Sequence, residues 1–261
     1  MATVSKRSRL AVWKDVIFAL FIRTIRSQFN DKFGLSWAVV NPVSFILILS
    51  VIRGRLEGGT THTLDTFTFM ACGMLTVQMF LSALGASAGV IKKNKALFAF
   101  RQVRPISAFI ASGLFELLVK VLVLLSVVLA MYFLKIDILL ANPLLFIIAQ
   151  LAIFITAGAI GAMFAIATAF IPEIDKIRGM LTRPLFFISG VFFSLQDLPR
   201  DIWIYFQWNP ILHAIELSRQ AVSPSFGAVG VSLNFLLGCA LVSLFISLCC
   251  YQVYWKRAIS N

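Results

Sequence analysis

The sequence predicts an all-α, polytopic membrane protein, and three features of its composition carry this prediction. Of its 261 residues, 60% are hydrophobic and only 13% are charged. The mean hydropathy is +0.92, and a soluble domain of this length could not bury so much apolar surface. The charged residues gather at the ends of long apolar runs, as they do in proteins that cross a bilayer.

Six apolar runs are candidates for membrane-spanning helices, each of which needs about 20 mainly apolar residues to cross roughly 30 Å of hydrocarbon. They cover residues 36–52, 67–91, 106–134, 143–171, 180–195 and 231–254. Neither an internal repeat nor a low-complexity linker divides the chain. We therefore expect one membrane domain over 1–261, with a tail and interfacial helix at 1–34, a six-span core at 35–254 and a tail at 255–261.

Before the first span, apolar side chains recur every four residues. They are Trp13, Ile17, Phe21, Ile25 and Phe29, whereas Asp15, Arg23, Arg26 and Asn30 fall on the other side. This pattern predicts a helix lying in the headgroup layer with its cations toward phosphate and water. A short additional span is the alternative, but two arginines would be costly at the bilayer centre.

The basic residues predict the orientation of the spans. With the N-terminus inside, seventeen lie on the cytoplasmic side: Lys6, Arg7, Arg9, Lys14, Arg23, Arg26, Lys32, Lys92, Lys93, Lys95, Arg101, Arg104, Lys176, Arg178, Arg183, Lys256 and Arg257. Five lie on the far side: Arg53, Arg55, Lys135, Arg200 and Arg219. This bias favours cytoplasmic termini beside anionic membrane lipid. It also explains the basic composition without nucleic-acid binding.

The loop between the second and third spans exposes Leu97, Phe98 and Phe100 to the cytoplasm among several cations. An exposed apolar cluster of this kind favours a protein–protein contact. A loop that anchors itself in lipid headgroups is the alternative.

Residues 196–226 predict a re-entrant segment at the outer mouth of a pathway. Pro199 and Pro210 interrupt the chain, and the apolar stretch 202–208 between them is too short to cross. A helix on the outer leaflet is the alternative. Six aromatic residues are candidates for lining the pathway or its outer gate: Phe192, Phe193, Trp203, Tyr205, Phe206 and Trp208. An aromatic belt at the lipid interface explains them equally well.

No catalytic or metal-binding set is evident. The two histidines, His62 and His213, are far apart in sequence and fit surface or interface positions, and the four cysteines lie in apolar runs. Because the chain lacks a Gly-x-x-x-x-Gly-Lys-Ser/Thr loop, we expect no ATP hydrolysis by this chain alone.

Glu116 and Lys120 are spaced to pair within the third span, which favours a structural lock or pathway lining over a proton relay. Small residues at 157–162 would allow close helix contacts.

Several segments together resemble the membrane subunits of ABC-type polysaccharide exporters, especially those for group 2 capsular polysaccharide. They are IRTIRSQF at 22–29, LSWA at 35–38 with Pro42, LFAFRQVRPI at 97–106, PLFFISG at 184–190, WNPILHAIELSR at 208–219 and VSLN at 231–234. The resemblance covers nearly the whole chain. Asn41 departs from it, since an acidic residue is usual before this proline.

The resemblance implies a homodimer in the bacterial inner membrane that binds two cytoplasmic ATPase subunits, with ATP and Mg held by those subunits and no cofactor on this chain. It implies periplasmic partners and a lipid-linked, anionic polysaccharide as substrate. The coupling residues would be Leu97, Phe98, Phe100, Arg101 and Arg104, and the substrate would enter beside Arg23 and Arg26. O-antigen and teichoic-acid exporters share this plan. A gradient-driven carrier and a membrane enzyme or scaffold are the alternatives from other classes.

Overall fold

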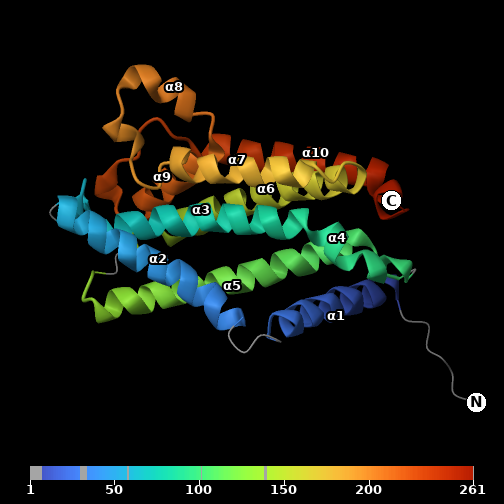
Figure 1. Ribbon diagram of the computed structural model, residues 1–261. Helices are drawn as coiled ribbons and strands as arrows, with labels where there is room; N and C mark the ends of the chain where they lie inside the picture. Colours follow the sequence, from blue (N-terminus) through green and yellow to red (C-terminus); the bar gives the residue numbers. More distant parts are fainter. Residues whose placement is uncertain (1–7, 30–33, 58, 101, 138–139, 261) are drawn as a thin grey trace, which may run out of the picture.

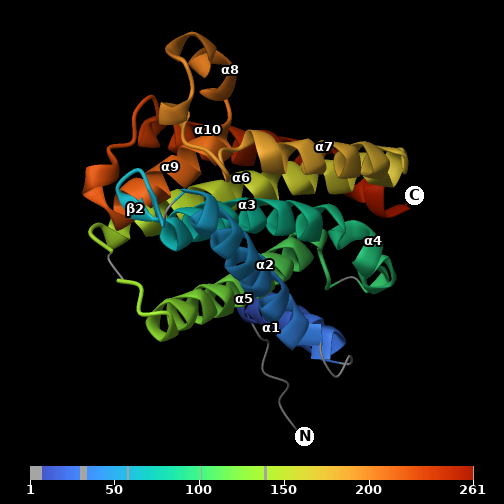
Figure 2. The same ribbon diagram turned by 60° about the vertical axis from the view of Figure 1, so that its left-hand side comes forward.

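The computed structural model describes residues 8–29, 34–57, 59–100, 102–137 and 140–260. The helices are α1 Arg9–Phe29, α2 Gly34–Glu57, α3 Thr66–Ala88, α4 Val90–Asn94, α5 Pro105–Phe133, α6 Pro143–Phe170, α7 Ile174–Ile188, α8 Trp203–Phe206, α9 Pro210–Val222 and α10 Leu233–Ser260. Most of the long helices run side by side, while α2 and α5 are inclined to the others (Figures 1 and 2). A two-stranded antiparallel hairpin joins β1 Thr60–Thr61 to β2 Leu64–Asp65. Short 3₁₀ turns are η1 Lys95–Ala99, η2 Leu195–Asp197, η3 Arg200–Ile202 and η4 Pro224–Phe226.

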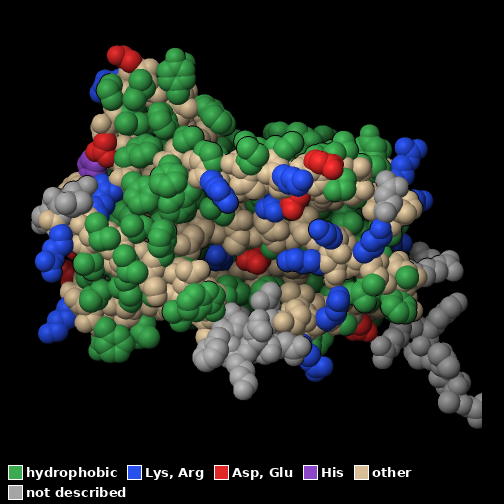
Figure 3. Space-filling view, in the orientation of Figure 1, with side chains coloured by type: hydrophobic (Ala, Val, Ile, Leu, Met, Phe, Trp, Pro, Cys, Tyr) green, Lys and Arg blue, Asp and Glu red, His purple; other side chains and the backbone are tan. Residues whose placement is uncertain are grey.

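The bundle has two distinct ends. One holds α1, α4 and the end of α10, and we call it the basic end. The other holds the β-hairpin, α8 and α9, and we call it the hairpin end (Figures 1 and 2). Hydrophobic side chains cover much of the visible surface, and Lys and Arg gather over the half that contains the basic end (Figure 3).

Within the described residues, five helices are long and apolar enough to cross a membrane. They are Ser36–Arg55 in α2, Thr66–Ala88, Pro105–Phe133, Pro143–Phe170 and Leu233–Ser260. They match five of the six predicted runs. Side chains and prolines cap the starts of three of them: Asp65 accepts from the Phe67 N–H at 2.8 Å, Asn142 accepts from the Leu145 N–H at 3.0 Å, and Pro105 and Pro143 are first residues of their helices.

The run predicted at 180–195 is placed differently. It corresponds to α7, which has 15 residues, begins at Ile174 and ends at Ile188. A helix of that length spans only about 22 Å. The predicted run began too late, because the first turn of the helix is polar. It also ended too late, because the helical backbone stops before Gly190, which has a φ of 77°. A Cβ atom there would lie 2.6 Å from Leu212 Cδ1 of α9.

The core is built around α3, which packs along α6, α2, α5 and α9. The close approach of α3 to α6 depends on Gly161, where a Cβ atom would lie 2.5 Å from the Leu84 carbonyl oxygen. The predicted close contact at the small-residue run is therefore confirmed. At the basic end, α1 lies against α5, and the Trp13 Nε1–H donates to Ser107 Oγ at 2.9 Å.

Candidate functional site

A buried polar network at the hairpin end is organised by α9. Asn209 caps this helix by accepting from the Ile211 N–H at 3.0 Å, and Pro210 occupies its first turn. Eleven of its thirteen residues are buried, because α9 is enclosed by α3, α6 and α10. α9 is thus a buried helix whose polar side chains need partners inside the protein.

Arg219 is the centre of this network and is completely buried. Its Nη1 donates to Glu216 Oε1 at 3.0 Å and to the Phe193 carbonyl at 3.1 Å, and its Nη2 donates to the Val191 carbonyl at 3.0 Å. Its Cζ lies 3.5 Å from the centroid of the Phe69 ring. The sequence places Arg219 among the few basic residues of the far side, but it does not show that this charge is buried and paired within the protein.

A second arginine reaches the same turn from α2. Arg53 Nη1 donates to the Phe192 carbonyl, and its Cζ lies 4.9 Å from the Phe69 ring centroid. Two guanidinium groups thereby take the carbonyls of three consecutive residues, 191–193, directly after α7. Carbonyls in such a non-helical turn have no helical N–H partners, and when buried they need other donors. The two arginines therefore stabilise a break in helical structure and join it to α2, α3 and α9.

Glu216 completes the network on its other side. Its Oε2 accepts from Ser194 Oγ at 3.0 Å. Ser194 begins η2 in a capping box with Asp197, and the Asp197 Oδ1 lies 2.9 Å from His62 Nε2 of the hairpin. A buried ion pair with all its hydrogen bonds made adds little net stability, but losing one partner typically costs about 3–5 kcal/mol. The pair therefore holds α9, η2 and the hairpin in one arrangement.

Gln150 of α6 fixes α9 from the opposite side. Its Nε2 donates to Thr76 Oγ1 of α3 at 2.7 Å and to Ser218 Oγ of α9 at 2.9 Å. A single amide thus joins three helices in the core.

His213 is buried as well, contrary to the surface or interface position expected from the sequence. Its Nε2 lies 2.7 Å from the Gln207 carbonyl, and its Nδ1 accepts from the Ser232 N–H at 3.0 Å. A neutral ring with the proton on Nε2 fits these two contacts, and Nδ1 also lies 3.3 Å from the Ser232 carbonyl. Burial lowers the pKa of His213, which favours the same neutral form.

Among the described residues, no group of three or more His, Cys, Asp or Glu could hold a metal ion.

The six predicted pathway aromatics do not form one cluster. Phe193 and Phe206 pack edge to face, with centroids 5.7 Å apart. Phe192 instead stacks on Phe187 of α7 at 6.0 Å. Trp203 donates from Nε1 to the Leu198 carbonyl at 2.8 Å, while Tyr205 and Trp208 are exposed on and just after α8. The structure thus separates the six into inward-packed and exposed rings.

At the basic end, the predicted coupling residues have unequal exposure. Phe98 is buried in a cluster with Leu20 of α1 and Ala111 of α5, so the expectation that it is exposed was wrong. The short η1 turn places the Phe98 ring against α1 and α5. Phe100 is 64% exposed, Leu97 is half-buried and Arg104 is exposed at the start of α5. Arg101 lies outside the described residues.

The two predicted arginines of α1 are both exposed. Arg23 Nη1 donates to Asn94 Oδ1 of α4 at 3.0 Å. This hydrogen bond joins α1 to the start of the predicted coupling loop.

Glu116 and Lys120 lie four residues apart on α5, and both are half-buried. They interact electrostatically, but these two described side chains do not form a direct ion pair.

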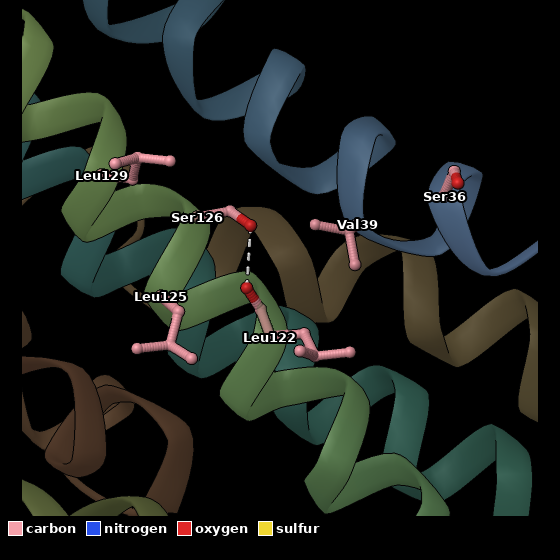
Figure 4. Close-up of a pocket in the computed structure, with 6 residues that line it drawn as sticks. All are labelled: Ser36, Val39, Leu122, Leu125, Ser126 and Leu129. Atoms are coloured by element: carbon pink, nitrogen blue, oxygen red, sulfur yellow. Dashed lines mark hydrogen bonds between the residues drawn. The ribbon is translucent and has the colours of Figure 1, made fainter.

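A groove of about 360 Å³ opens between α2 and α5. Val39 of α2 points toward the side of α5 that carries Leu122 and Ser126 (Figure 4). Ser126 Oγ donates to the Leu122 carbonyl at 2.8 Å, so the groove presents mainly hydrocarbon. The lining consists of Ser36, Val39, Leu122, Leu125, Ser126 and Leu129. An alkyl chain suits such a groove.

Sequence reasoning missed the Arg219 network. A signal was available: Glu216 and Arg219 stand three residues apart within a helix that is otherwise apolar, after an asparagine–proline start. Opposite charges at that spacing meet on one helix face. The contact of Arg53 with this turn had no such signal, because its partner there is the backbone carbonyl of Phe192, 139 residues away.

Comparison with known proteins adds one family match and three relatives. The family model for the ABC-2 type transporter matches residues 15–223. The polysialic acid transport protein KpsM of Escherichia coli is 35% identical over 256 residues, covering 98% of this chain and 99% of KpsM. The capsule polysaccharide export inner-membrane protein CtrC of Neisseria meningitidis serogroup B is 25% identical and covers 95% of this chain and 94% of CtrC. Its counterpart BexB of Haemophilus influenzae is also 25% identical, with coverage of 94% and 93%.

Proposed function

Since the chain belongs to the ABC-2 type transporter membrane family, we propose that it is the membrane subunit of an ATP-driven exporter of lipid-linked capsular polysaccharide. The observation that carries the proposal is the 35% identity to a polysialic acid transport protein over 98% of this chain. Two further relatives, which match over 93–95% of each chain, are named as capsule export proteins. Export proceeds from the cytoplasm across the inner membrane.

In this proposal the chain crosses the membrane six times, with the basic end and both termini in the cytoplasm. α7 is the fifth crossing in chain order, added to the five long spans and extended to membrane depth by the turn at 189–193. α9 is re-entrant from the outer side. Three observations support this arrangement: the excess of basic residues at one end, the complete hydrogen bonding of the 191–193 carbonyls and the enclosure of α9 by three spanning helices. Irregular backbone at membrane depth needs such internal partners.

The energy comes from two copies of a separate ATPase subunit, which bind at the coupling segment of residues 92–104. Phe100 supports this role because a ring that is 64% exposed among cations favours a protein contact. The Arg23–Asn94 hydrogen bond gives a route by which movement of this segment reaches α1. ATP-driven closure of the ATPase pair thereby biases the membrane dimer between two states.

The subunit acts as a homodimer. The described part of α7 supports this, because none of its fifteen residues is buried. Its large apolar side chains Ile177, Met180, Leu181, Phe187 and Ile188 are all exposed. A second copy covers this helix and closes a pathway that continues through periplasmic export proteins.

The substrate enters at the cytoplasmic side beside α1. Arg23 and Arg26 bind its anionic groups, because a guanidinium can donate two parallel hydrogen bonds to a phosphate or carboxylate. The α2–α5 groove accepts an alkyl chain of the lipid terminus. At the outer side, Phe193, Phe206 and the exposed rings of α8 meet the sugar chain through their apolar faces.

Purification of the tagged chain from its own host tests this proposal. We expect an ATPase with a complete phosphate-binding loop to copurify, and ATP hydrolysis to require that subunit, because this chain has no such loop. Hydrolysis by the chain alone, or recovery of the chain without any ATPase under conditions that keep the dimer, contradicts the proposal.

A further inference from the structure

A second cavity of about 510 Å³ lies at the basic end, between the first turn of α5 and the last turns of α10. Its lining residues are Arg104, Ile106, Tyr251, Gln252, Trp255 and Lys256. This cavity is distinct from the α2–α5 groove, and the exporter proposal assigns it no ligand.

The cavity has a positive rim. Arg104 and Lys256 are both exposed, and the lining contains no carboxylate. Among the described residues, neither cation forms an ion pair with an acidic side chain. Two cations that share a concave site without a counter-charge favour an anionic ligand.

The wall of the cavity is aromatic and ordered by contacts. The rings of Tyr251 and Trp255 stack at an interplanar angle of 14°, with centroids 6.1 Å apart. The Tyr251 hydroxyl accepts from the Ile106 N–H at 3.3 Å, which satisfies one of the free donors of the α5 N-terminus. Lys256 Nζ lies 5.8 Å from the Trp255 ring centroid. Both aromatic rings are half-buried, so they form a fixed side to the cavity.

The position of the cavity identifies the kind of anion. α5 and α10 are both long and apolar enough to span a bilayer, and the cavity lies where both reach the basic end. Tyr and Trp are typical of the depth at which headgroups meet hydrocarbon. Basic pockets between membrane helices at that depth are suited to lipid phosphates.

We propose that this cavity binds the headgroup of an anionic phospholipid, with Arg104 and Lys256 on the phosphate and with Tyr251 and Trp255 along the glycerol and first methylenes. The ligand is a membrane lipid, so the site is filled by diffusion within the bilayer. Because Arg104 ends the coupling segment, a bound lipid braces that segment against α10.

Native mass spectrometry of the full-length protein in detergent tests this assignment, with added phosphatidylglycerol compared with phosphatidylcholine. We expect phosphatidylglycerol to bind preferentially to the wild type. The double variant Arg104→Ala, Lys256→Ala should weaken that binding about 30-fold, since each cation near a lipid surface contributes about 5-fold. The charge-conserving variant Arg104→Lys, Lys256→Arg should stay within about 3-fold of the wild type, because a phosphate contact depends mainly on charge.

The matched control is Lys95→Ala, Arg257→Ala, which removes two cations from the same end without altering the cavity lining. It should retain wild-type preference. Equal phosphatidylglycerol binding by the wild type and the cavity variant overturns the assignment, as does equal loss in the control. Unchanged lipid binding together with lost ATPase recovery in the cavity variant would instead make the cavity a protein contact. This readout needs neither ATP nor glycan, so its failure leaves the exporter proposal intact.

Discussion

Arg219 of α9 lies over Phe69 of α3, with its Cζ atom 3.5 Å from the ring centroid, while its guanidinium donates to Glu216 and to the carbonyls of Val191 and Phe193. The contact requires Gly73 one turn along α3, where a Cβ atom would lie 3.1 Å from both Arg219 Nη2 and the Val191 oxygen. One buried cation therefore joins two helices to the turn after α7.

Arg219→Ala should lower the free energy of unfolding by about 3–5 kcal/mol, because it leaves the Glu216 carboxylate buried without its partner. Replacing both residues, as Glu216→Leu with Arg219→Met, should cost less than Arg219→Ala alone, since no unpaired charge remains. Thermal unfolding of the detergent-purified protein measures both. Arg200→Ala, an exposed arginine at the same end, is the control and should leave the melting temperature unchanged. A double variant less stable than the single one would show that charge pairing is not what the network provides.

Phe100→Ala should abolish ATPase recovery without loss of stability, because the ring is 64% exposed. Phe98→Ala is the contrasting variant: its ring is buried, and truncating a buried phenylalanine typically costs about 3–5 kcal/mol. Copurification and melting temperature, measured on the same preparations, separate the two effects. Full ATPase recovery with Phe100→Ala would contradict the coupling role and favour the alternative, that this segment anchors itself in lipid headgroups.

The proposed topology predicts which engineered cysteines a membrane-impermeant thiol reagent reaches in intact spheroplasts. In a background without the four native cysteines, Thr60→Cys and Ser225→Cys should react, whereas Lys95→Cys and Ser260→Cys should not. All four positions are exposed on the protein, so the membrane alone decides the outcome. Labelling at Ser260 together with Thr60 would mean an odd number of crossings.

The Arg23→Ala, Arg26→Ala variant should reduce surface polysaccharide, and the corresponding pair of Arg→Lys changes should reduce it less, because only arginine donates in a bidentate fork. Arg26→Lys alone is informative, since Arg23 also donates to Asn94. Surface polymer is measured at equal protein level and equal ATPase recovery. Normal export by the double alanine variant would make α1 a membrane anchor only.

The sequence predicts the spanning helices well where apolar length and capping residues agree: Pro143 begins both the predicted run and α6, and α5 begins at Pro105, one residue before the predicted run. It places α7 poorly, because a polar first turn and a glycine with positive φ set its limits. The burial of Phe98 and Arg219 was not predicted for one shared reason: local sequence shows which side chains are apolar or charged, whereas burial depends on helices brought together from distant parts of the chain.

The central claim, that this chain carries a lipid-linked capsular polysaccharide outward, is tested most directly by deleting its gene in the host and measuring polymer on both sides of the membrane. The account predicts that surface polysaccharide disappears while lipid-linked polymer accumulates in the cytoplasm, and that the wild-type gene restores export. Normal surface polysaccharide in the deletion strain, with no accumulation inside, would contradict it.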